Sequence, residues 1–308
     1  MSASSPAPPS GSVFRFAAAA QPCGVLVNSP HSGRYYSPQF LASSQLDALA
    51  LRRSEDAWVD ELLLGAPAAG AHLLCALYPR AYVDLNRPPR ELDPAMFAEP
   101  LPADIVTQSP HIAAGLGTIP RKVSERMEIY AHPLSWREAA ERLTRIYDPF
   151  HAHMRRRLRQ TRAEGGGQAL LLDMHSMPSL PHPHDASGIR MSPTAVARPD
   201  IVLGNRFGES CHPAIVGRIA SFLHAEGYSV SHNRPYAGGY ITAQYGRPDG
   251  GVHAVQIELN RALYMEEASL TPHAGFAALQ ASLTRLMRHI AAHWMDWLPA
   301  WHPVRAAE

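Results

Sequence analysis

Three apolar segments of the chain end in side chains that can bind a metal or move a proton. The first is followed by His31, the second contains Asp173 and His175, and the third contains Glu258. Ionisable groups beside buried segments are costly unless they find partners, and sites in open α/β sheets collect beyond the carboxyl ends of the strands. One such histidine alone would more often be an inert core or turn residue. Because the arrangement recurs, we expect these side chains to meet at one site.

The residue types in this set predict a hydrolytic zinc centre. Two neutral imidazoles and one carboxylate form a three-ligand zinc site that leaves a fourth position for water. His31 and His175 are the imidazole candidates, and Glu55 and Asp56 are the carboxylate candidates. Zinc lowers the pKa of water to about 7 and makes it a usable nucleophile. Glu258 is the candidate base, because its segment is otherwise apolar and no basic residue follows four positions later.

The segment "YPRAYVDLNRPP" carries groups that can recognise a carboxylate, namely Arg80, Asn86 and Arg87. A planar guanidinium binds a carboxylate through two parallel hydrogen bonds. A second arginine can polarise a carbonyl and stabilise the oxyanion that develops there. The alternative is a surface turn closed by an Asp–Arg ion pair, which the spacing alone favours.

The stretch "NRPYAGGYITAQYG" combines paired glycines with hydroxyl groups. The glycines permit the close approach of a ligand, to which Tyr240 and Thr242 can donate hydrogen bonds. The nucleotide-binding patterns GxGxxG and GxxxxGK[ST] are absent. A serine nucleophile is disfavoured, because Ser32 and Ser176 do not lie in a GxSxG pattern.

The elements that must position these residues alternate between strands and helices. The pattern predicts strands at 23–28, on both sides of Pro79, within 168–179 and at 252–259, helices within 46–65, 132–164 and 272–293, and a helix that leads into a short strand within 211–230. Residues 93–125 and 178–205 are predicted to be loops, and the second has the length of a lid or binding loop. The alternation, with strands apolar on both faces, predicts one three-layer α/β/α sandwich with a mixed central sheet.

Composition excludes several classes of protein. The 308 residues are 46% apolar and 18% charged with a formal net charge of +1, which is typical of a globular protein and indicates no nucleic-acid or membrane partner. No apolar run approaches the ~20 residues of a membrane span. Three widely spaced cysteines and the lack of a signal peptide favour a cytoplasmic protein. Residues 1–14 are expected to form a disordered tail. Oligomeric state is not encoded in any pattern.

Together these motifs resemble the N-formylglutamate amidohydrolase (N-formylglutamate deformylase) family. The likeness covers residues 25–266 and consists, in family order, of "SPHSG", "SEDAWVDEL", "DLNRP", "DMHSMPS", "GNRFGESC" and "GGYITAQYGRPDGGVHAVQIELNRALYM". The family looks like a branch of the zinc carboxypeptidase and aspartoacylase superfamily, with its zinc-exopeptidase-like fold. The alternation of strands and helices predicts one domain over residues 15–308. The resemblance implies that this domain uses Zn²⁺ to hydrolyse N-formyl-L-glutamate to formate and L-glutamate in histidine breakdown.

The resemblance also implies roles for individual residues. His31 and His175 correspond to the two zinc imidazoles, and Glu258 corresponds to the general base. The wider superfamily takes two ligands from an HxxE motif, and here no glutamate follows His31 at that spacing. The carboxylate ligand must come from elsewhere. Asp56 matches the formylglutamate branch best, with Glu55 as the fallback.

The same resemblance assigns substrate contacts to this chain. Asn86 and Arg87 correspond to the pair that grips a substrate carboxylate, and Arg80 corresponds to the arginine that polarises the carbonyl. Asp173 is expected to support the ligands from behind. The resemblance does not specify which residue binds the second carboxylate of glutamate. Arg206, Arg234 and Arg190, which lie in family-like or lid-like segments, are the candidates.

Several alternatives remain open at this point. Mn²⁺, Co²⁺ or Fe²⁺ can occupy a similar site. The same residues would also serve a deacylase for another N-acylated acidic amino acid, or a carboxypeptidase. A non-catalytic small-molecule binding protein is disfavoured, because neither imidazole nor the base is missing from the sequence.

Overall fold

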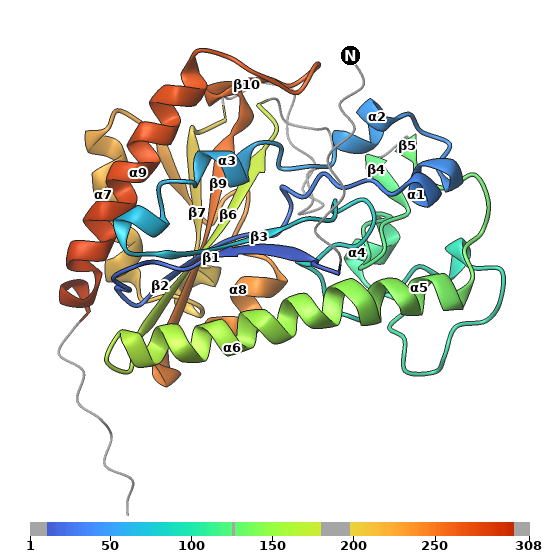
Figure 1. The fold of residues 1–308 in the computed structure, drawn as a ribbon, viewed down its shortest axis with the longest axis horizontal. Helices are drawn as coiled ribbons and strands as arrows, with labels where there is room; N and C mark the ends of the chain where they lie inside the picture. Colours follow the sequence, from blue (N-terminus) through green and yellow to red (C-terminus); the bar gives the residue numbers. More distant parts are fainter. Residues whose placement is uncertain (1–10, 125–126, 180–197, 299–308) are drawn as a thin grey trace, which may run out of the picture.

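A seven-stranded sheet forms the middle layer of the molecule (Figure 1). The computed structural model describes residues 11–124, 127–179 and 198–298. In spatial order the strands are β1 (Phe14–Ala17), β3 (His72–Ala76), β2 (Val25–Ser29), β6 (Ala169–Met177), β9 (Val252–Asn260), β7 (Ile201–Gly204) and β8 (Val230–His232). β1 is antiparallel to β3 and β7 is antiparallel to β9, whereas the other neighbours are parallel. The predicted mixed sheet is confirmed.

Helices cover both faces of this sheet, as the predicted three-layer sandwich requires (Figure 1). On one face, α3 (Val59–Leu62), α7 (Pro213–Ala225) and α9 (Gly275–His293) share an apolar core with the strands. On the other face, α6 (Asp148–Glu164) and α8 (Tyr240–Tyr245) do so. The smaller elements are α1 (Pro38–Ser43), α2 (Ala48–Arg52), α4 (Pro110–Ala113), α5 (Trp136–Arg142) and the two-stranded pairs β4 (Lys122–Ser124) with β5 (Met127–Glu128) and β10 (Met265–Glu266) with β11 (Thr271–Pro272).

The two faces of the central strands explain where polar groups emerge. Side chains alternate along a strand, so Leu171 of β6 and Ala254 of β9 face α6, while their neighbours face α7 and α9. Further along β6 and β9, the α6-facing positions change from apolar to polar. The side chains at those positions are Asp173, His175, Gln256 and Glu258. The site therefore lies on the α6-facing side of β6 and β9, where the side chains on this face become polar.

The helix expected within 46–65 is wrong as a single element. It divides into α2 and α3, and the turn between them carries Glu55 and Asp56. The backbone N–H of Asp56 donates to the carbonyl of His31 at 3.0 Å, and Trp58 adopts a positive φ of 67°. These tertiary contacts override the helical spacing of the apolar residues.

Two further predictions need correction in the neighbouring loops. Residues 80–87, expected to be a second strand after Pro79, form turns, because the carboxylate of Asp84 binds Arg80 and the backbone N–H of Asn86. Residues 201–204 of the predicted loop 178–205 form β7, and 180–197 lie outside the described residues.

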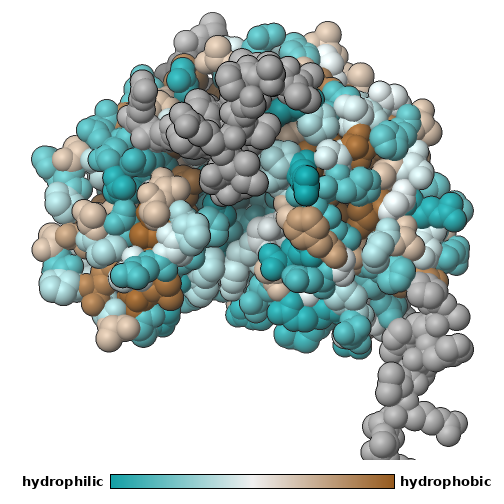
Figure 2. Space-filling view, turned by 180° about the vertical axis from the view of Figure 1, so that it is seen from behind, coloured by the Kyte–Doolittle hydropathy of each residue, from teal (hydrophilic) through white to brown (hydrophobic). Residues whose placement is uncertain are grey.

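The other predicted helices are confirmed. The region 132–164 contains α5 and α6, joined by a π-helical turn at Leu143–Tyr147. β1 begins at Phe14, the last residue of the predicted tail, and residues 1–10 are outside the described part. Among the described residues, no helix has the length and apolar character needed to cross a membrane. Figure 2 shows the rear face, which is hollowed near its middle and bordered there by largely hydrophilic surface.

Candidate metal centre

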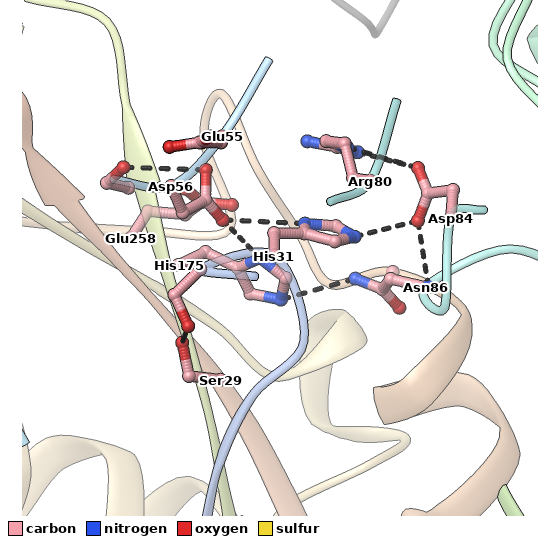
Figure 3. Close-up of polar contacts among 12 residues, drawn as sticks. Ser29, His31, Glu55, Asp56, Arg80, Asp84, Asn86, His175 and Glu258 are labelled. Carbon is pink, nitrogen blue, oxygen red and sulfur yellow. Dashed lines mark hydrogen bonds and ion pairs between the residues drawn. The ribbon is translucent and has the colours of Figure 1, made fainter. Parts of the chain in front are cut away.

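Three adjacent strands bring the predicted residues together. β2, β6 and β9 are neighbours in the sheet and run parallel, so their carboxyl ends lie at one edge. His31 follows β2, His175 is near the end of β6, and Glu258 is its direct partner in the register of β9. Figure 3 shows these residues converging with Asp56 from the turn between α2 and α3.

His31, Asp56 and His175 form a buried group that could hold a metal ion. Their candidate ligand atoms all lie within 4.8 Å of one another. Oδ2 of Asp56 is 2.9 Å from Nδ1 of His175 and 3.4 Å from Nδ1 of His31. Nδ1 of His31 is buried and has no hydrogen-bond partner, which is rare for a buried polar atom. Two imidazole nitrogens and a carboxylate suit Zn²⁺ and related divalent ions, so the residues present fit such a metal.

Each imidazole is supported from behind by a carboxylate. Nε2 of His31 lies 2.7 Å from Oδ1 of Asp84, and Nε2 of His175 lies 3.1 Å from Oδ2 of Asp173. Asp173 in turn accepts a hydrogen bond of 2.7 Å from Asn28. With a metal bound, this arrangement would keep the ring proton on Nε2, leave the Nδ1 lone pair for the cation and raise the basicity of the ligand. Asp173 therefore contacts His175 as Asp84 contacts His31, and the supporting role expected of Asp173 stays a prediction.

Of the two carboxylate candidates, Asp56 faces the imidazoles. Glu55 points away from them and accepts hydrogen bonds from Arg52 at 3.1 Å and from the hydroxyl of Tyr36 at 2.8 Å. Burial raises the pKa of Glu55 above its ordinary value. Glu55 therefore closes the turn, and Asp56 completes the donor group.

Glu258 lies beside this group in a buried position. Burial raises its pKa to about 7, against the opposing effect of the His175 charge. Its Oε1 accepts a hydrogen bond of 2.7 Å from Nε2 of Gln256, whose own Oε1 accepts from the backbone N–H of Gly239 at 2.7 Å. A carboxyl with a pKa near neutrality is suited to exchanging protons with a reacting group.

Arg80 and Asn86 border the same centre. Nη2 of Arg80 binds Oδ2 of Asp84 at 2.9 Å. Burial lowers the pKa of Arg80, but the charges of Asp84, Asp56 and Glu258 raise it above its usual value. Nδ2 of Asn86 lies 3.3 Å from Nε2 of His175, and its Oδ1 accepts the backbone N–H of Ile241 at 2.7 Å.

The other predicted substrate contacts are arranged less directly. Arg87 donates to the carbonyls of Leu116 at 3.0 Å and of Asn86 at 3.1 Å. Burial lowers its pKa. Thr242 is fully buried and donates its hydroxyl to the carbonyl of Gly239 at 2.9 Å. Thr242 therefore stabilises the glycine loop, and its contact with a ligand stays a prediction.

The remaining predicted substrate contacts are Tyr240, Arg206, Arg234 and Arg190. Tyr240 is half-buried at the start of α8. Arg206 pairs with Glu209 at 3.3 Å, and its side chain lies against Gly238. Arg234 is exposed, and Arg190 is outside the described residues.

Three polar residues of the centre were not among the predicted site residues: Asp84, Gln256 and Arg261. Gln256 and Arg261 flank Glu258 on and just after an apolar strand, which is a signal that sequence reasoning could have used. Asp84 lies in "DLNRP", where an ion pair within a surface turn explained it equally well.

Fold and site together define a mixed-sheet α/β protein with a buried His–Asp–His group at the carboxyl edge of its central strands. Comparison with known proteins narrows this class. The sequence profile of N-formylglutamate amidohydrolase matches residues 23–265. The chain belongs to the N-formylglutamate amidohydrolase family.

Individual relatives agree with this assignment. The N-formylglutamate deformylase of Pseudomonas aeruginosa is 33% identical over 92% of this chain and 95% of its own length, and that of Pseudomonas putida is 33% identical over 79% and 82%. The crystal structure of N-formylglutamate amidohydrolase from Ralstonia eutropha superposes with a TM-score of 0.85 at 33% identity, covering 93% of this chain and 99% of that one. A gene product of Agrobacterium tumefaciens shares the fold, with a TM-score of 0.65 at 18% identity, over 93% and 97%.

Proposed function

We propose that this protein is a metal-dependent amidohydrolase that hydrolyses N-formyl-L-glutamate to formate and L-glutamate, as a step in histidine breakdown. The substrate follows from the activity for which its relatives are named. The observation that carries the metal dependence is the buried Nδ1 of His31, which has no hydrogen-bond partner and belongs with Asp56 and His175 to a group that could hold a metal.

His31, Asp56 and His175 would hold the metal, with Zn²⁺ as the proposed ion. When bound, Zn²⁺ supplies Lewis acidity toward the formyl carbonyl and lowers the pKa of water. Asp84 and Asp173 hold the two rings in the orientation that metal binding requires.

In the proposed reaction, Glu258 moves the proton. Its carboxylate accepts a proton from the attacking water while the new C–O bond forms at the formyl carbon. Glu258 then donates that proton to the amide nitrogen as the C–N bond breaks, so formate and the amine of glutamate leave. The guanidinium of Arg80 is proposed to stabilise the developing oxyanion, and Asn86 and Arg87 to hold a substrate carboxylate.

We further propose that Tyr240 and Arg206 contact the remainder of the substrate, because both border the glycine loop that packs on Asn86. Residues 15–308 are proposed to form one domain. The three cysteines are free, which favours a reducing compartment and supports a cytoplasmic location.

Metal analysis combined with a substrate panel tests this function. The full-length protein should contain one zinc per chain, lose activity with chelator and recover it with added zinc. It should prefer N-formyl-L-glutamate to N-acetyl- and N-succinyl-glutamate and to other N-formyl amino acids. Turnover by thoroughly metal-free protein would refute the metal dependence. A preference for another acyl group would keep the chemistry and replace the substrate.

A further inference from the structure

We infer that Arg261 is a positioning residue for Asp56, the carboxylate of the proposed metal centre. The inference rests on the proposed metal-binding role of His31, Asp56 and His175. Nothing in the family comparison assigns a part to Arg261, which lies just after β9 and is separated from Asp56 by 205 positions in the chain.

The guanidinium of Arg261 connects the whole turn that presents Asp56. Nη2 donates to the carbonyl of Glu55 at 2.6 Å and lies 3.4 Å from Oδ1 of Asp56, while Nη1 lies 3.4 Å from the carbonyl of Arg53. Nε donates to Oγ of Ser176 at 3.2 Å. The side chain is buried, so these contacts offset the cost of removing a charge from water.

The turn has backbone hydrogen bonds of its own, from the N–H of Asp56 to the carbonyl of His31 at 3.0 Å and from the N–H of Glu55 to that of Arg52 at 2.9 Å, but these do not fix the carboxylate of Asp56. The turn joins the short helices α2 and α3, and Trp58 directly after it has a positive φ of 67°, a conformation that is unfavourable for a bulky residue. A flexible ligand loop loses conformational entropy when it binds a metal. By ordering the turn beforehand, Arg261 reduces that cost.

The contacts also distinguish the two oxygens of Asp56. Oδ1 faces Arg261 and the hydroxyl of Ser176, each at 3.4 Å. Oδ2 faces the imidazoles of His31 and His175. Arg261 and Ser176 thus hold the carboxylate by one oxygen and present the other to the metal group.

Arg261 also places the turn of Asp56 against the end of the strand that carries the proposed base. It follows Glu258 by three positions at the end of β9, and Ser176 follows His175 directly in β6. Tyr264, on the same turn after β9, donates to the carbonyl of Ala57 at 3.0 Å. Arg261 and Tyr264, which follow the strand that carries Glu258, therefore both bind the turn that carries Asp56.

The test compares Arg261→Gln with Arg142→Gln in the full chain. Arg142 is also a buried arginine, and it binds the carbonyl of Tyr82 at 3.3 Å and the hydroxyl of Tyr130 at 2.6 Å, neither of which belongs to the metal group. Zinc Kd is measured by competition with a chelator, and the Tm of the metal-free protein is measured in parallel. We expect Arg261→Gln to weaken zinc binding about 10–100-fold, and Arg142→Gln to lower Tm without changing the zinc Kd.

The outcomes separate this inference from the proposed function. If the wild-type protein binds no zinc at one per chain, the proposed metal site fails and Arg261 loses its role with it. If the wild type binds zinc and folded Arg261→Gln binds it equally tightly, only the Arg261 inference fails. Should Arg261→Gln not fold, Arg261→Lys and Ser176→Ala replace it. Both are expected to weaken zinc binding by a smaller factor, and unchanged binding in both would overturn the inference.

Discussion

Asp84 contacts both a proposed metal ligand, His31, and the proposed oxyanion donor, Arg80. One oxygen accepts from Nε2 of His31 at 2.7 Å, and the other binds Arg80 at 2.9 Å. The guanidinium of Arg80 holds the pKa of Asp84 well below its ordinary value despite burial. The carboxylate therefore stays ionised and can orient both the proposed ligand and the proposed oxyanion donor.

Asp84→Asn should weaken zinc binding about 10–100-fold, because the substitution removes the charge that makes His31 a better ligand. Zinc Kd from chelator competition measures the effect. Asp93→Asn is the matched control, since Asp93 is also buried and paired with an arginine, Arg121, at 2.8 Å. Equal affinities for wild type and Asp84→Asn would show that this carboxylate is dispensable.

Glu258→Gln should lower kcat about 10²–10⁴-fold, the usual contribution of a general base. The amide keeps the shape of the side chain but cannot accept the proton. Zinc content should stay at the wild-type level, because Glu258 is not among the proposed ligands. Glu266→Gln, at an exposed position on β10, is the control and should retain full activity. A Glu258→Gln protein with near-normal kcat would remove the base from the mechanism.

The residues of the site differ in how far they could be predicted. His31, His175 and Glu258 were recognisable because each interrupts or follows an apolar strand, where a polar side chain needs a reason. Arg261 and Gln256 act through partners that are distant in sequence or on another loop. Their positions beside Glu258 mark them as candidates, but no local pattern reports which partners they contact. The resemblance favoured Asp56 over Glu55, but only the structure shows that Asp56 faces the imidazoles, since adjacent positions in a turn can point in opposite directions.

At the scale of elements, the buried strands and the long helices were the predictable parts. Their apolar patterns are strong, and burial enforces them. The segment 46–65 was not predictable, because its helical spacing competes with contacts from His31 and Arg261. The turns at 80–87 were not predicted for a similar reason. The backbone N–H of Asn86 donates to the carboxylate of Asp84, where a strand would pair with a neighbouring strand.

The loop before α8 gives a prediction at this scale. An added Cβ at Gly239 would lie 2.5 Å from Nδ2 of Asn86, so Gly239→Ala must displace either the loop or the Asn86 amide. We expect kcat/KM to fall tenfold or more. Gly217→Ala in α7, where a Cβ meets nothing within 4 Å, should keep its activity and gain about 0.5–1 kcal/mol of stability. Unchanged kcat/KM in Gly239→Ala would mean that this packing is not required for turnover.

At the scale of the whole molecule, buried histidines couple folding to pH. Burial lowers the pKa of His253 to about 4, and its Nδ1 accepts the backbone N–H of His212 at 3.3 Å. The unfolded chain binds this proton near the ordinary pKa of 6.5. Between these values the unfolded state holds more protons, so the contribution of His253 to stability is full above pH 6.5 and declines toward pH 4.

His253→Asn keeps an acceptor but cannot titrate. The difference in free energy of unfolding between wild type and this variant should therefore shrink as the pH falls from 7 to 5, by at most about 1.4 kcal/mol per pH unit. Urea unfolding of both metal-free proteins at several pH values measures it. A constant difference across that range would show that His253 takes up its proton equally in both states.

The pairing of β6 with β9 has a consequence for how the chain finds its fold. His175 stands opposite Glu258, and Asp173 stands opposite Gln256, on the face where Leu171 and Ala254 meet the helix. Sliding either strand by one residue would turn its two polar groups into the apolar layer on the other side of the sheet. In a chain with the wrong register, charged side chains would be buried in the apolar layer and the site would not form. We therefore expect the groups proposed for catalysis also to disfavour incorrect alignment of β6 and β9. A chain that can bind metal here must have formed its central sheet in the correct register.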